Sequence, residues 1–338
     1  MEFIRVEDCC EILDSQRKPI TESERVPGRY PYYGANGIQG TINEYIFDDK
    51  LVLVAEDGGH FGSKTKPIAY LVNGKCWVNN HAHVLRAKKG FLAEYICYSL
   101  MFYKIEGYIN GATRQKLTQA ALRKLIIPKR PVEYQKAIVD RLDLVKCIIE
   151  KKQDLINELD VLIKSRFVEM FGIFNVNTNN QNTIKFKDLI EQNNNNEDDL
   201  VWLLNLDMIK ANTGEIVEKV YINRQNIPTS SISFKKGTVL YSKLRPYLNK
   251  VVIADENGYG TSELIPLSAY KNGLTAEYLA YYLRQDSFVE YIKDKVTGAK
   301  MPRVAMDILR NIDIVQPNYV YQEQFSSFVY QINKLKFA

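Results

Sequence analysis

The chain has 338 residues, of which 46% are hydrophobic and 25% charged, and its formal net charge is +5. This length accommodates two domains with cores of their own. No apolar run approaches the ~18 residues of a membrane span, and the acidic, mixed start MEFIRVEDCC is unlike a signal peptide, so we expect a cytoplasmic protein. Five cysteines without a CxxC pair exclude a disulfide framework and a zinc ribbon.

Residues 1–130 predict a first domain of mixed β/α structure. Short apolar runs such as IFDDKLVLVAED and KCWVNNHAHVLRA indicate strands broken by turns. The stretch FLAEYICYSLMFYKIEGYI is the one clear helix, and it runs into the glycine-containing turn GATRQK.

Residues 131–172 predict one long helix, with Pro131 in its first turn and Gly172 at its end. About 40 residues at 1.5 Å per residue give a rod of roughly 60 Å. The apolar residues of this helix follow a heptad pattern, which Lys152 and Arg166 interrupt. A heptad pattern indicates packing against another helix. The apolar seam consists of Ile138, Leu142, Val145, Ile149, Ile156, Leu159 and Ile163, followed by Met170.

Residues 173–318 predict a second domain with an Asn-rich linker at its start, and residues 319–338 a second helix shorter than the first. The second half repeats the first, because AEYICYSL matches AEYLAYYL. Three further pairs share an offset of 187 residues: Gly111-Ala112 with Gly298-Ala299, Leu122-Arg123 with Leu309-Arg310, and Tyr134-Gln135 with Tyr321-Gln322.

The chemistry of catalysis is missing from the sequence. It contains no phosphate-binding G-x-x-x-x-G-K-[ST] loop, no G-x-S-x-G elbow and no [DNS]PP[YFW] tetrapeptide. His81 and His83 could face one side of a strand, but no third ligand stands at metal-binding spacing. Glu56-Asp57 beside Gly58-Gly59 is typical of a turn with solvated acids. We therefore expect no metal and no catalytic residue.

Basic side chains lie where a polyanion could bind. The net charge is +5 in residues 1–130, −1 in 131–172 and +1 in 173–338. The segment between Phe234 and Ala254 holds five basic residues and no acid, and the turns GATRQK and GAKMPR occur at equivalent places in the two halves. These features favour contact with DNA phosphates and bases over an ordinary charged surface, which stays the alternative.

The sequence resembles the DNA-specificity (S) subunits of Type I restriction–modification systems over nearly its whole length. The resemblance rests on the order of two domains and two helices and on YPYYGANGIQG, NNHAHVLRA, the AEY helix, GATRQKLT, LRKLIIPKRPVEYQKAIVDRL and KSRFVEMFG. It implies an α+β fold in which two target-recognition domains are separated by long helices that form an antiparallel coiled coil. In this chain the second helix is shorter than the first. Two explanations stay open: the second helix is truncated, or a helix of another chain completes the pairing along the first helix.

The resemblance also implies the function. Each domain would read one half of a bipartite, asymmetric site in double-stranded DNA, and the helices would dock two modification (methyltransferase) subunits, which restriction (motor-nuclease) subunits join. The chain itself would be non-catalytic and hold no cofactor, with S-adenosylmethionine bound by the methyltransferase partner. The alternative is a scaffold whose two domains bind proteins.

The candidate DNA contacts combine basic groups for phosphates, amides and aromatics for base edges, and glycines for close approach. In the first domain they are Tyr32, Tyr33, Asn36, Gly58, Gly59, His81, Arg114 and Gln115. In the second they are Lys243, Arg245, Tyr247, Thr261, Lys300 and Arg303.

Overall fold

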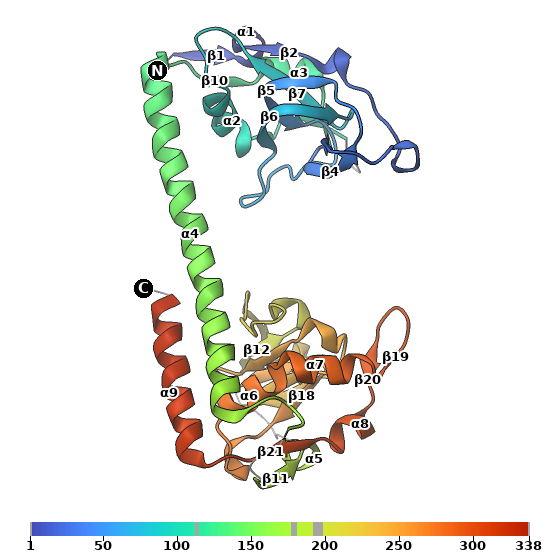
Figure 1. Ribbon diagram of the computed structural model, residues 1–338, viewed down its shortest axis with the longest axis vertical. Coiled ribbons are helices and arrows are strands. Elements are labelled where there is room, and N and C mark those ends of the chain that lie inside the picture. The colour runs from blue at the N-terminus through green and yellow to red at the C-terminus, as the bar shows by residue number, and fades with distance from the viewer. Residues whose placement is uncertain (1, 112–114, 177–180, 192–198, 337–338) are drawn as a thin grey trace. The chain divides into compact units, whose positions relative to one another are not determined.

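The duplication seen in the sequence reappears as two units that each run from a strand and a short helix through a series of strands and a helix to a hairpin, a short helix, a strand and a long helix (Figure 1). The computed structural model describes residues 2–111, 115–176, 181–191 and 199–336. Unit 1 spans Met1–Glu150 and unit 2 Lys151–Ala338. The division falls inside α4 (Val132–Phe171), so this helix contributes residues to both units, whereas the predicted boundaries at 130 and 172 coincide with its ends.

Unit 1 is built on a six-stranded sheet in the order β2-β7-β5-β6-β3-β4. The apolar run Leu51–Ala55 places β5 in the middle of this sheet, where those residues are fully buried. Besides α4, the elements of unit 1 are β1 (Phe3–Arg5), α1 (Val6–Cys9), β2 (Cys10–Ile12), β3 (Tyr30–Gly34), β4 (Gly37–Ile42), β5 (Phe47–Ala55), β6 (Ala69–Val78), β7 (Ala82–Ala87), α2 (Ala93–Met101), β8 (Ile109–Asn110), β9 (Lys116–Leu117), α3 (Gln119–Lys124) and β10 (Ile126–Pro128).

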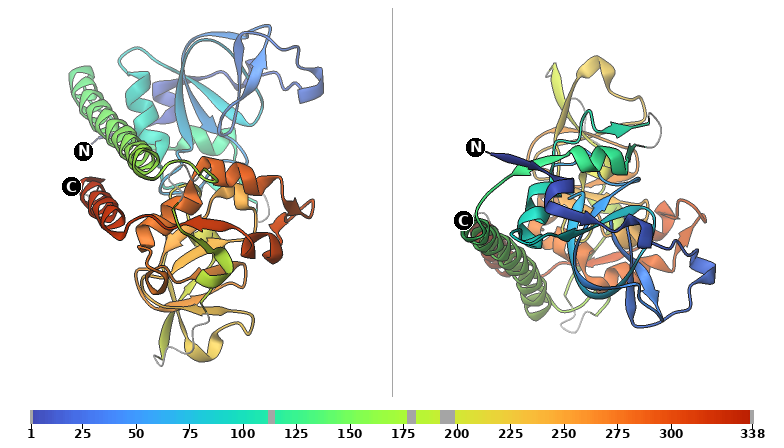
Figure 2. Two further views of the ribbon diagram at one scale, coloured as in Figure 1. Left: turned by 60° about the horizontal axis from the view of Figure 1, so that its bottom comes forward. Right: turned by 90° about the horizontal axis from the view of Figure 1, so that it is seen from above.

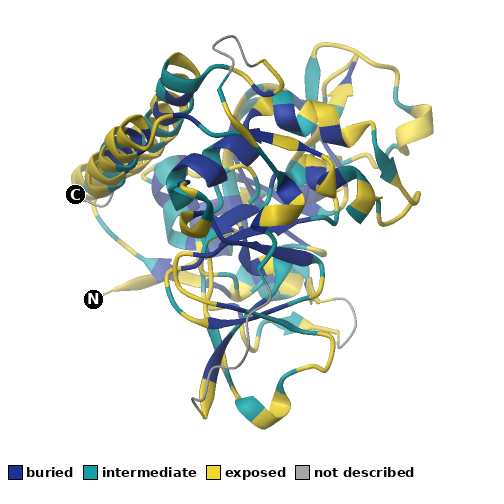
Figure 3. Ribbon diagram, turned by 90° about the horizontal axis from the view of Figure 1, so that it is seen from below, coloured by how far each residue is buried: buried dark blue, intermediate teal, exposed yellow. Residues whose placement is uncertain are grey.

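Unit 2 divides its strands between a four-stranded sheet, β13-β12-β17-β14, and a three-stranded sheet, β16-β15-β18. In both units the buried residues line the strands and the helices that cover them (Figure 3). The elements are β11 (Thr183–Lys185), α5 (Phe186–Leu189), β12 (Leu200–Leu204), β13 (Val220–Asn223), β14 (Ile232–Phe234), β15 (Val239–Ser242), β16 (Val251–Ile253), β17 (Gly258–Gly260), β18 (Leu264–Leu267), α6 (Ala276–Arg284), α7 (Asp286–Lys293), β19 (Val296–Thr297), β20 (Arg303–Val304), α8 (Met306–Arg310), β21 (Asp313–Val315) and α9 (Tyr319–Lys336).

Equivalent elements pair in the same way in the two units. Strand β1 pairs antiparallel with β10, and β11 with β21. The helical turn that follows each first strand is held by the same backbone bond, Val6 N to Leu125 O and Phe186 N to Ile312 O, both 2.9 Å. The Asn-rich start of the second domain, predicted as a linker with a surface loop, contains β11 and α5, which open the domain.

Helix α9 packs antiparallel on the last turns of α4, within unit 2 (Figures 1 and 2). Phe325, near the start of α9, lies 5.2 Å from Phe167 between ring centroids, and Lys336 at its end bonds to Asp160 at 2.5 Å. The antiparallel helix pair with a short second helix is therefore confirmed.

The seam on α4 differs in part from the heptad prediction. Ile163 is buried, but the next contacts come from Phe167 and Phe171, whereas Arg166 forms a surface pair with Glu169. Because the pairing covers only about three turns, steps of four residues keep one face toward α9 without a supercoil. Of the other seam residues, Ile138 and Leu159 are half-buried against the cores of their units and Ile156 is half-buried, whereas Leu142, Val145 and Ile149 are 39%, 52% and 64% exposed.

Candidate nucleic-acid interface

Two turns occupy the same place in the two units. The β5 turn, residues 56–58, follows the central strand of unit 1, and the β15 turn, residues 243–245, follows the central strand of the three-stranded sheet in unit 2. They are 187 residues apart, the offset of the sequence repeat. The β5 turn reads Glu-Asp-Gly, and the β15 turn Lys-Leu-Arg.

A short hairpin docks on each turn through matching bonds. In unit 1, Leu117 N donates to Glu56 O at 2.7 Å, and Asp57 forms a β-bridge with Lys116. In unit 2, Val304 N donates to Lys243 O at 3.1 Å, and Leu244 forms a β-bridge with Arg303. The strands that flank the Gly-Ala turns are therefore held against the β5 and β15 turns.

The third residue of each turn has a left-handed backbone. Gly58 has a φ of 64° and Arg245 a φ of 48°. Glycine adopts this conformation without cost, whereas for arginine it is strained by ~1–3 kcal/mol. The Arg245 backbone is held there by its N–H, which donates to Pro302 O at 2.7 Å.

A polar cavity of about 580 Å³ lies beside the β5 turn, and we call it the first-domain cavity. Its side chains offer several unlike hydrogen-bonding groups, as a surface that reads base edges requires. It is lined by Pro19, Ile20, Thr21, Arg25, Tyr32, Ala35, Asn36, Gln39, Asp57, Gly58, Asn79, Asn80 and His81.

Two hydrogen-bonded pairs orient side chains at this cavity. His81 Nδ1 lies 2.7 Å from Asp57 Oδ1, so Nδ1 carries the proton and the ring turns Nε2 away from the carboxylate. The buried Asn79 accepts the His81 N–H and donates its Nδ2 to Gln39 Oε1 at 3.0 Å. Within the described residues no acceptor meets Gln39 Nε2, which leaves this amide as a donor at the cavity.

The aromatic and glycine predictions need correction in part. Tyr32 is 1% exposed, and its hydroxyl donates to Ile20 O and accepts from Ile20 N, so it supports the cavity and does not read a base. Arg25 stacks on its ring at 4.1 Å. Tyr33 is half-buried beside Tyr70. A Cβ on Gly59 would lie 2.4 Å from Ala55 Cβ, so packing on β5 accounts for this glycine.

The other predicted residues of the first domain lie near the β5 turn where they are described. Asn36 donates its Nδ2 to Gly58 O at 2.9 Å, and His81 bonds to Asp57 of the turn. Gln115 is exposed next to Lys116, whose ammonium pairs with Glu56 at 2.9 Å. Arg114 lies outside the described residues.

The acids beside Gly58 are ion-paired, contrary to the expectation of solvated carboxylates. Glu56 accepts Arg17 Nη1 at 2.6 Å, and His83 bonds Asp14 Oδ2 through Nδ1 at 2.6 Å and Leu117 O through Nε2 at 2.8 Å. Burial alone raises the pKa of Glu56 and of Asp14, but bonds from Arg17 and Lys116 to Glu56, and from His83 and Gln119 to Asp14, hold both pKa values below the ordinary range.

Asp14, Glu56 and His83 bring their ligand atoms within 4.8 Å of one another, which is close enough to hold a metal ion. The Nε2 of His83 faces a carbonyl oxygen and must donate, and its Nδ1 faces a carboxylate. Both ring nitrogens are thus engaged in hydrogen bonds, and a metal ion would have to displace those bonds as well as Arg17. The cluster is an internal ion network that supports the β5 turn.

In unit 2 the predicted residues gather around the β15 turn. Lys243 N donates to Glu263 O at 3.0 Å, and Thr261 Oγ1 accepts the Glu263 N–H at 3.1 Å. Arg245 Nη2 approaches Lys300 O at 3.4 Å, and Tyr247 is 46% exposed. Arg303 stays a predicted DNA contact, but its guanidinium is already paired, because it donates to Glu263 Oε1 at 2.8–2.9 Å, which offsets its charge.

Sequence reasoning missed Arg25, Gln39, Asn79 and Glu263. Gln39 and Asn79 stand within the motifs YPYYGANGIQG and NNHAH, so their amides offered a signal. Arg25 and Glu263 reach their partners Tyr32 and Arg303 only through the fold, and no local pattern marks them.

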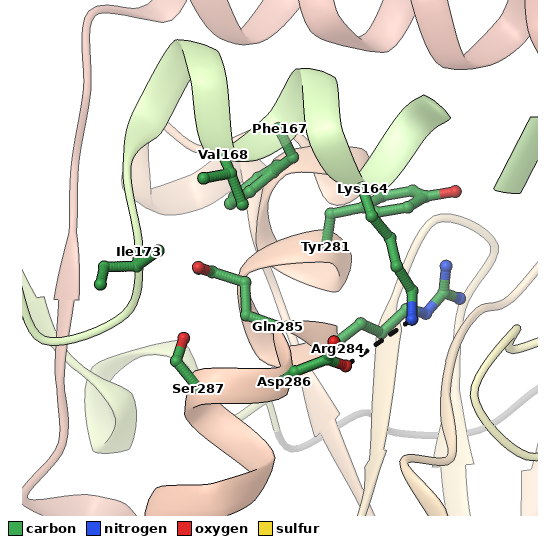
Figure 4. Close-up of a pocket in the computed structure, with 9 residues that line it drawn as sticks. All are labelled: Lys164, Phe167, Val168, Ile173, Tyr281, Arg284, Gln285, Asp286 and Ser287. Atoms are coloured by element: carbon green, nitrogen blue, oxygen red, sulfur yellow. Dashed lines mark ion pairs between the residues drawn. The ribbon is translucent and has the colours of Figure 1, made fainter. Parts of the chain in front are cut away.

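A second cavity, of about 230 Å³, lies between the end of α4 and helices α6 and α7 (Figure 4). Phe167, Val168 and Ile173 supply apolar walls, and Lys164 pairs with Asp286 at 3.7 Å at its edge. It is smaller than the ~300–1,000 Å³ of ligand sites, and none of the predicted DNA contacts lines it.

Comparison with known proteins finds similar proteins of one kind. Residues 1–161 match the model of the Type I restriction modification DNA specificity domain, and the chain resembles Type I specificity subunits as the sequence predicted. The first part of the chain is therefore similar to this domain family over just under half of the chain's length.

Three curated relatives carry the same description. The putative type I restriction enzyme specificity subunit S.HindORF215P of Haemophilus influenzae is 34% identical over 148 residues, which are 44% of this chain and 38% of the relative. The EcoDI specificity subunit of Escherichia coli is 20% identical to this chain, over 90% of this chain and 75% of the relative. The MjaIX specificity subunit of Methanocaldococcus jannaschii is 27% identical, over 38% of this chain and 30% of the relative. The match thus spans well under two thirds of the first and third relatives.

Two solved structures share the fold. The Type-I restriction-modification system S subunit from M. genitalium superposes with a TM-score of 0.55 at 13% identity, over 99% of this chain and 90% of its own. A chain from a study of complex assembly and conformational transition in the type I R-M system gives 0.53 at 14% identity, over 99% and 91%. These matches agree with two domains of mixed strands and helices joined by a long helix. Among the described residues, none of the helices has the length and apolar character needed to cross a bilayer.

Proposed function

We propose that the chain is the DNA sequence-recognition subunit of a Type I restriction–modification complex and reads a bipartite, asymmetric site. The observation that carries the proposal is the pair of equivalent turns, the β5 turn and the β15 turn, each joined to a docked hairpin by the same bonds. One scaffold presented twice with different side chains suits two half-sites of different sequence.

The chemistry of the two sites supports this asymmetry. In unit 1 the β5 turn adjoins amide side chains and the pair Asp57–His81, which suit donors and acceptors on base edges. In unit 2 Lys243, Arg245 and Lys300 supply positive charge for phosphates and for guanine acceptors.

The exposed part of α4 supports docking of partner subunits. Every residue from 141 to 155 is exposed, including Leu144, Val145 and Ile149 at 60%, 52% and 64%. Such a face gains free energy when it is covered. We assign it to the two modification subunits, which restriction subunits join, with a helix of another copy of this chain as the alternative occupant. The chain catalyses nothing in this proposal, and the modification subunit holds S-adenosylmethionine.

The proposal is tested by mapping methylated adenines in the source genome with this gene intact and deleted. A bipartite motif should lose its methylation on deletion. The full chain with its modification subunits should also select that motif from random duplexes. Affinity should fall with salt at a log–log slope near −0.9 per phosphate neutralised. A contiguous motif, or salt-insensitive binding, would contradict the proposal.

The exposed apolar face of α4 also favours a second candidate, a scaffold whose two domains bind proteins. A gel shift with random duplex, with and without the modification subunits, separates the two. The scaffold predicts no shift under either condition, and specific retention of one bipartite duplex excludes it.

A further inference from the structure

One duplicated motif is not explained by DNA contact. Gln135 and Gln322 stand 187 residues apart, in the first turns of α4 and α9. Both are fully buried, at 0% exposure. A buried glutamine is costly unless its amide is fully hydrogen-bonded, so these two positions have a specific structural role.

In unit 1 the amide of Gln135 joins three segments. Its Oε1 accepts the N–H of Leu92, just before α2, at 2.9 Å. Its Nε2 donates to Gly90 O at 2.9 Å and to Arg130 O, just before α4, at 2.8 Å. One side chain thus ties the base of α4 to the loop that begins α2.

Gln322 repeats this arrangement in unit 2. Its Oε1 accepts Thr275 N at 2.9 Å, and its Nε2 donates to Gly273 O at 3.2 Å and Pro317 O at 2.8 Å. One acceptor and two donors are used in each copy. Among side chains, only a carboxamide supplies this set.

The tyrosines of the two AEY motifs complete each joint. Tyr95 on α2 donates its hydroxyl to Pro128 O on β10 at 2.8 Å, and Tyr278 on α6 donates to Val315 O on β21 at 2.7 Å. Strands β10 and β21 lead directly into α4 and α9. Each helix is therefore held at its base by one tyrosine and one glutamine.

In unit 1 few contacts besides those of Gln135 set the direction in which α4 leaves the domain. Ile138 and Val139 of α4 pack on the unit 1 core, Asp143 accepts a hydrogen bond from Tyr98 of α2, and the side chains of residues 141–155 are exposed. A tilt of about 10° at the base moves a point ~30 Å along the helix by ~5 Å, which exceeds the ~3.4 Å rise of a base pair. A small change in the angle of α4 at its base therefore displaces the far part of the helix by more than one base pair.

We infer that Gln135 and Gln322 are positioning residues that fix the directions of α4 and α9 and so the permitted spacing between the two half-sites. The inference rests on the proposed function. Gln135 acts on α4 directly. Gln322 acts through α9, whose Phe325 packs on Phe167 of α4.

The test is a spacer selection with the full chain bound to the modification subunits of its own system. The duplexes carry the two half-sites found for the unaltered protein, separated by spacers of every length within three base pairs of the natural one. The variants are Gln135→Met and Gln322→Met, which keep the side-chain length and remove the hydrogen bonds. The matched control is Gln153→Met, because Gln153 is exposed on α4 and its amide bonds only to Asn157 among the described residues.

The unaltered protein and Gln153→Met should prefer one spacer. Gln135→Met should keep the half-site sequences but lose about tenfold of its preference over the neighbouring spacers, equivalent to ~1.4 kcal/mol. A lower melting temperature with unchanged spacer preference would overturn the inference, because a purely stabilising residue lowers the folded fraction without altering selectivity.

Milder variants decide the outcome if the methionine variants do not fold. Tyr95→Phe and Tyr278→Phe each remove one hydrogen bond and keep the ring, and each should broaden the spacer preference less. Unchanged preference in both would overturn the inference. Failure of the unaltered complex to select any bipartite sequence would instead overturn the proposed function.

Discussion

Gly58 and Arg245 occupy the same left-handed backbone position at the ends of the β5 and β15 turns. In the first domain this position holds glycine, which adopts the left-handed conformation without a steric penalty. In the second domain it holds arginine, whose side chain is a cation. A strained residue kept at a candidate site points to a functional reason for its side chain. The charge and the strain of Arg245 can be separated by substitution.

We expect Arg245→Gly to be about 1 kcal/mol more stable than Arg245→Ala, because only glycine relieves the left-handed strain. Both variants should weaken DNA binding to the same extent, since both remove the guanidinium. Unfolding is followed by the fluorescence of Trp202 in a Trp77→Phe background. Equal stabilities of the two variants would contradict the backbone argument.

Gln39 tests direct reading by the first-domain cavity. Gln39→Ala should lower affinity for the selected site about tenfold and remove discrimination at one base pair of the first half-site, as loss of an amide–base contact does. Competition with singly substituted duplexes measures this, with Gln153→Ala as the control. An equal loss for every duplex would show that Gln39 does not read a base.

Asp14 and Glu56 make the stability of unit 1 dependent on acid. Their folded-state pKa values lie below the ordinary values, so their contribution is complete above about pH 5 and is lost as the pH falls through the folded pKa values. Glu56→Gln should be destabilised at pH 7, and its difference from the unaltered protein should shrink on acidification. Urea unfolding followed by Trp77, in a Trp202→Phe background, measures both.

The control for the acid dependence is Glu44→Gln, because Glu44 is exposed. This variant should follow the unaltered protein at every pH. A constant difference between Glu56→Gln and the unaltered protein from pH 7 to pH 3.5 would contradict the ion-network argument.

At the scale of elements, α4 has two kinds of surface. Its last turns are part of the unit 2 core, where Ile163 and Phe167 meet Phe325 and Val329 of α9. Residues 141–155 contribute nothing to a core and are available to a partner. The last turns of α4 therefore contribute to the stability of unit 2, whereas residues 141–155 are the part of the helix on which a partner subunit could dock.

Phe167→Ala should cost ~3–5 kcal/mol, because the side chain is 1% exposed and its removal leaves a cavity. Ile149→Ala should change stability by less than ~0.5 kcal/mol, since that side chain is 64% exposed. Thermal unfolding compares the two. Ile149→Ala should instead weaken copurification with the modification subunits, and unaffected copurification would argue against docking there.

At the scale of the whole molecule, the proposed function makes the length of α4 a determinant of the DNA site. Duplicating residues 142–148 inserts one heptad, or about 10 Å of helix, which corresponds to about three base pairs. The insertion should change the selected spacer and leave both half-site sequences as they were. Selection from random duplexes measures this, and an unmoved spacer would show that α4 does not set it.

The element order and the long helix were predictable because their signals are local. Hydrophobic period, the absence of internal proline and glycine, and flanking Pro131 and Gly172 define α4 without reference to the rest of the chain. The seam was predicted less well. Position 166 falls on the predicted heptad seam, where Arg166 interrupts the apolar pattern. Packing over three turns instead selects Phe167, and only the facing helix α9 decides between the two positions.

The candidate site was predictable as far as motifs mark it. The two Gly-Ala turns pointed to Lys300 and Arg303, and NNHAH pointed to His81. Whether each side chain is free to contact DNA depended on hydrogen-bond and ion-pair partners that are distant in the chain. Glu263 neutralises Arg303, and both hydroxyl bonds of Tyr32 are satisfied by Ile20.

The sequence alone determined the two-domain order, the internal repeat, the long helix and the resemblance to specificity subunits, because these depend on local period and on motif order. Only the tertiary structure showed that the β5 and β15 turns are equivalent and that Gln135 and Gln322 close the same three-way joint. The physical reason is that such sites are defined by hydrogen bonds and charge pairs between segments far apart in the chain. Composition and spacing do not encode those partners.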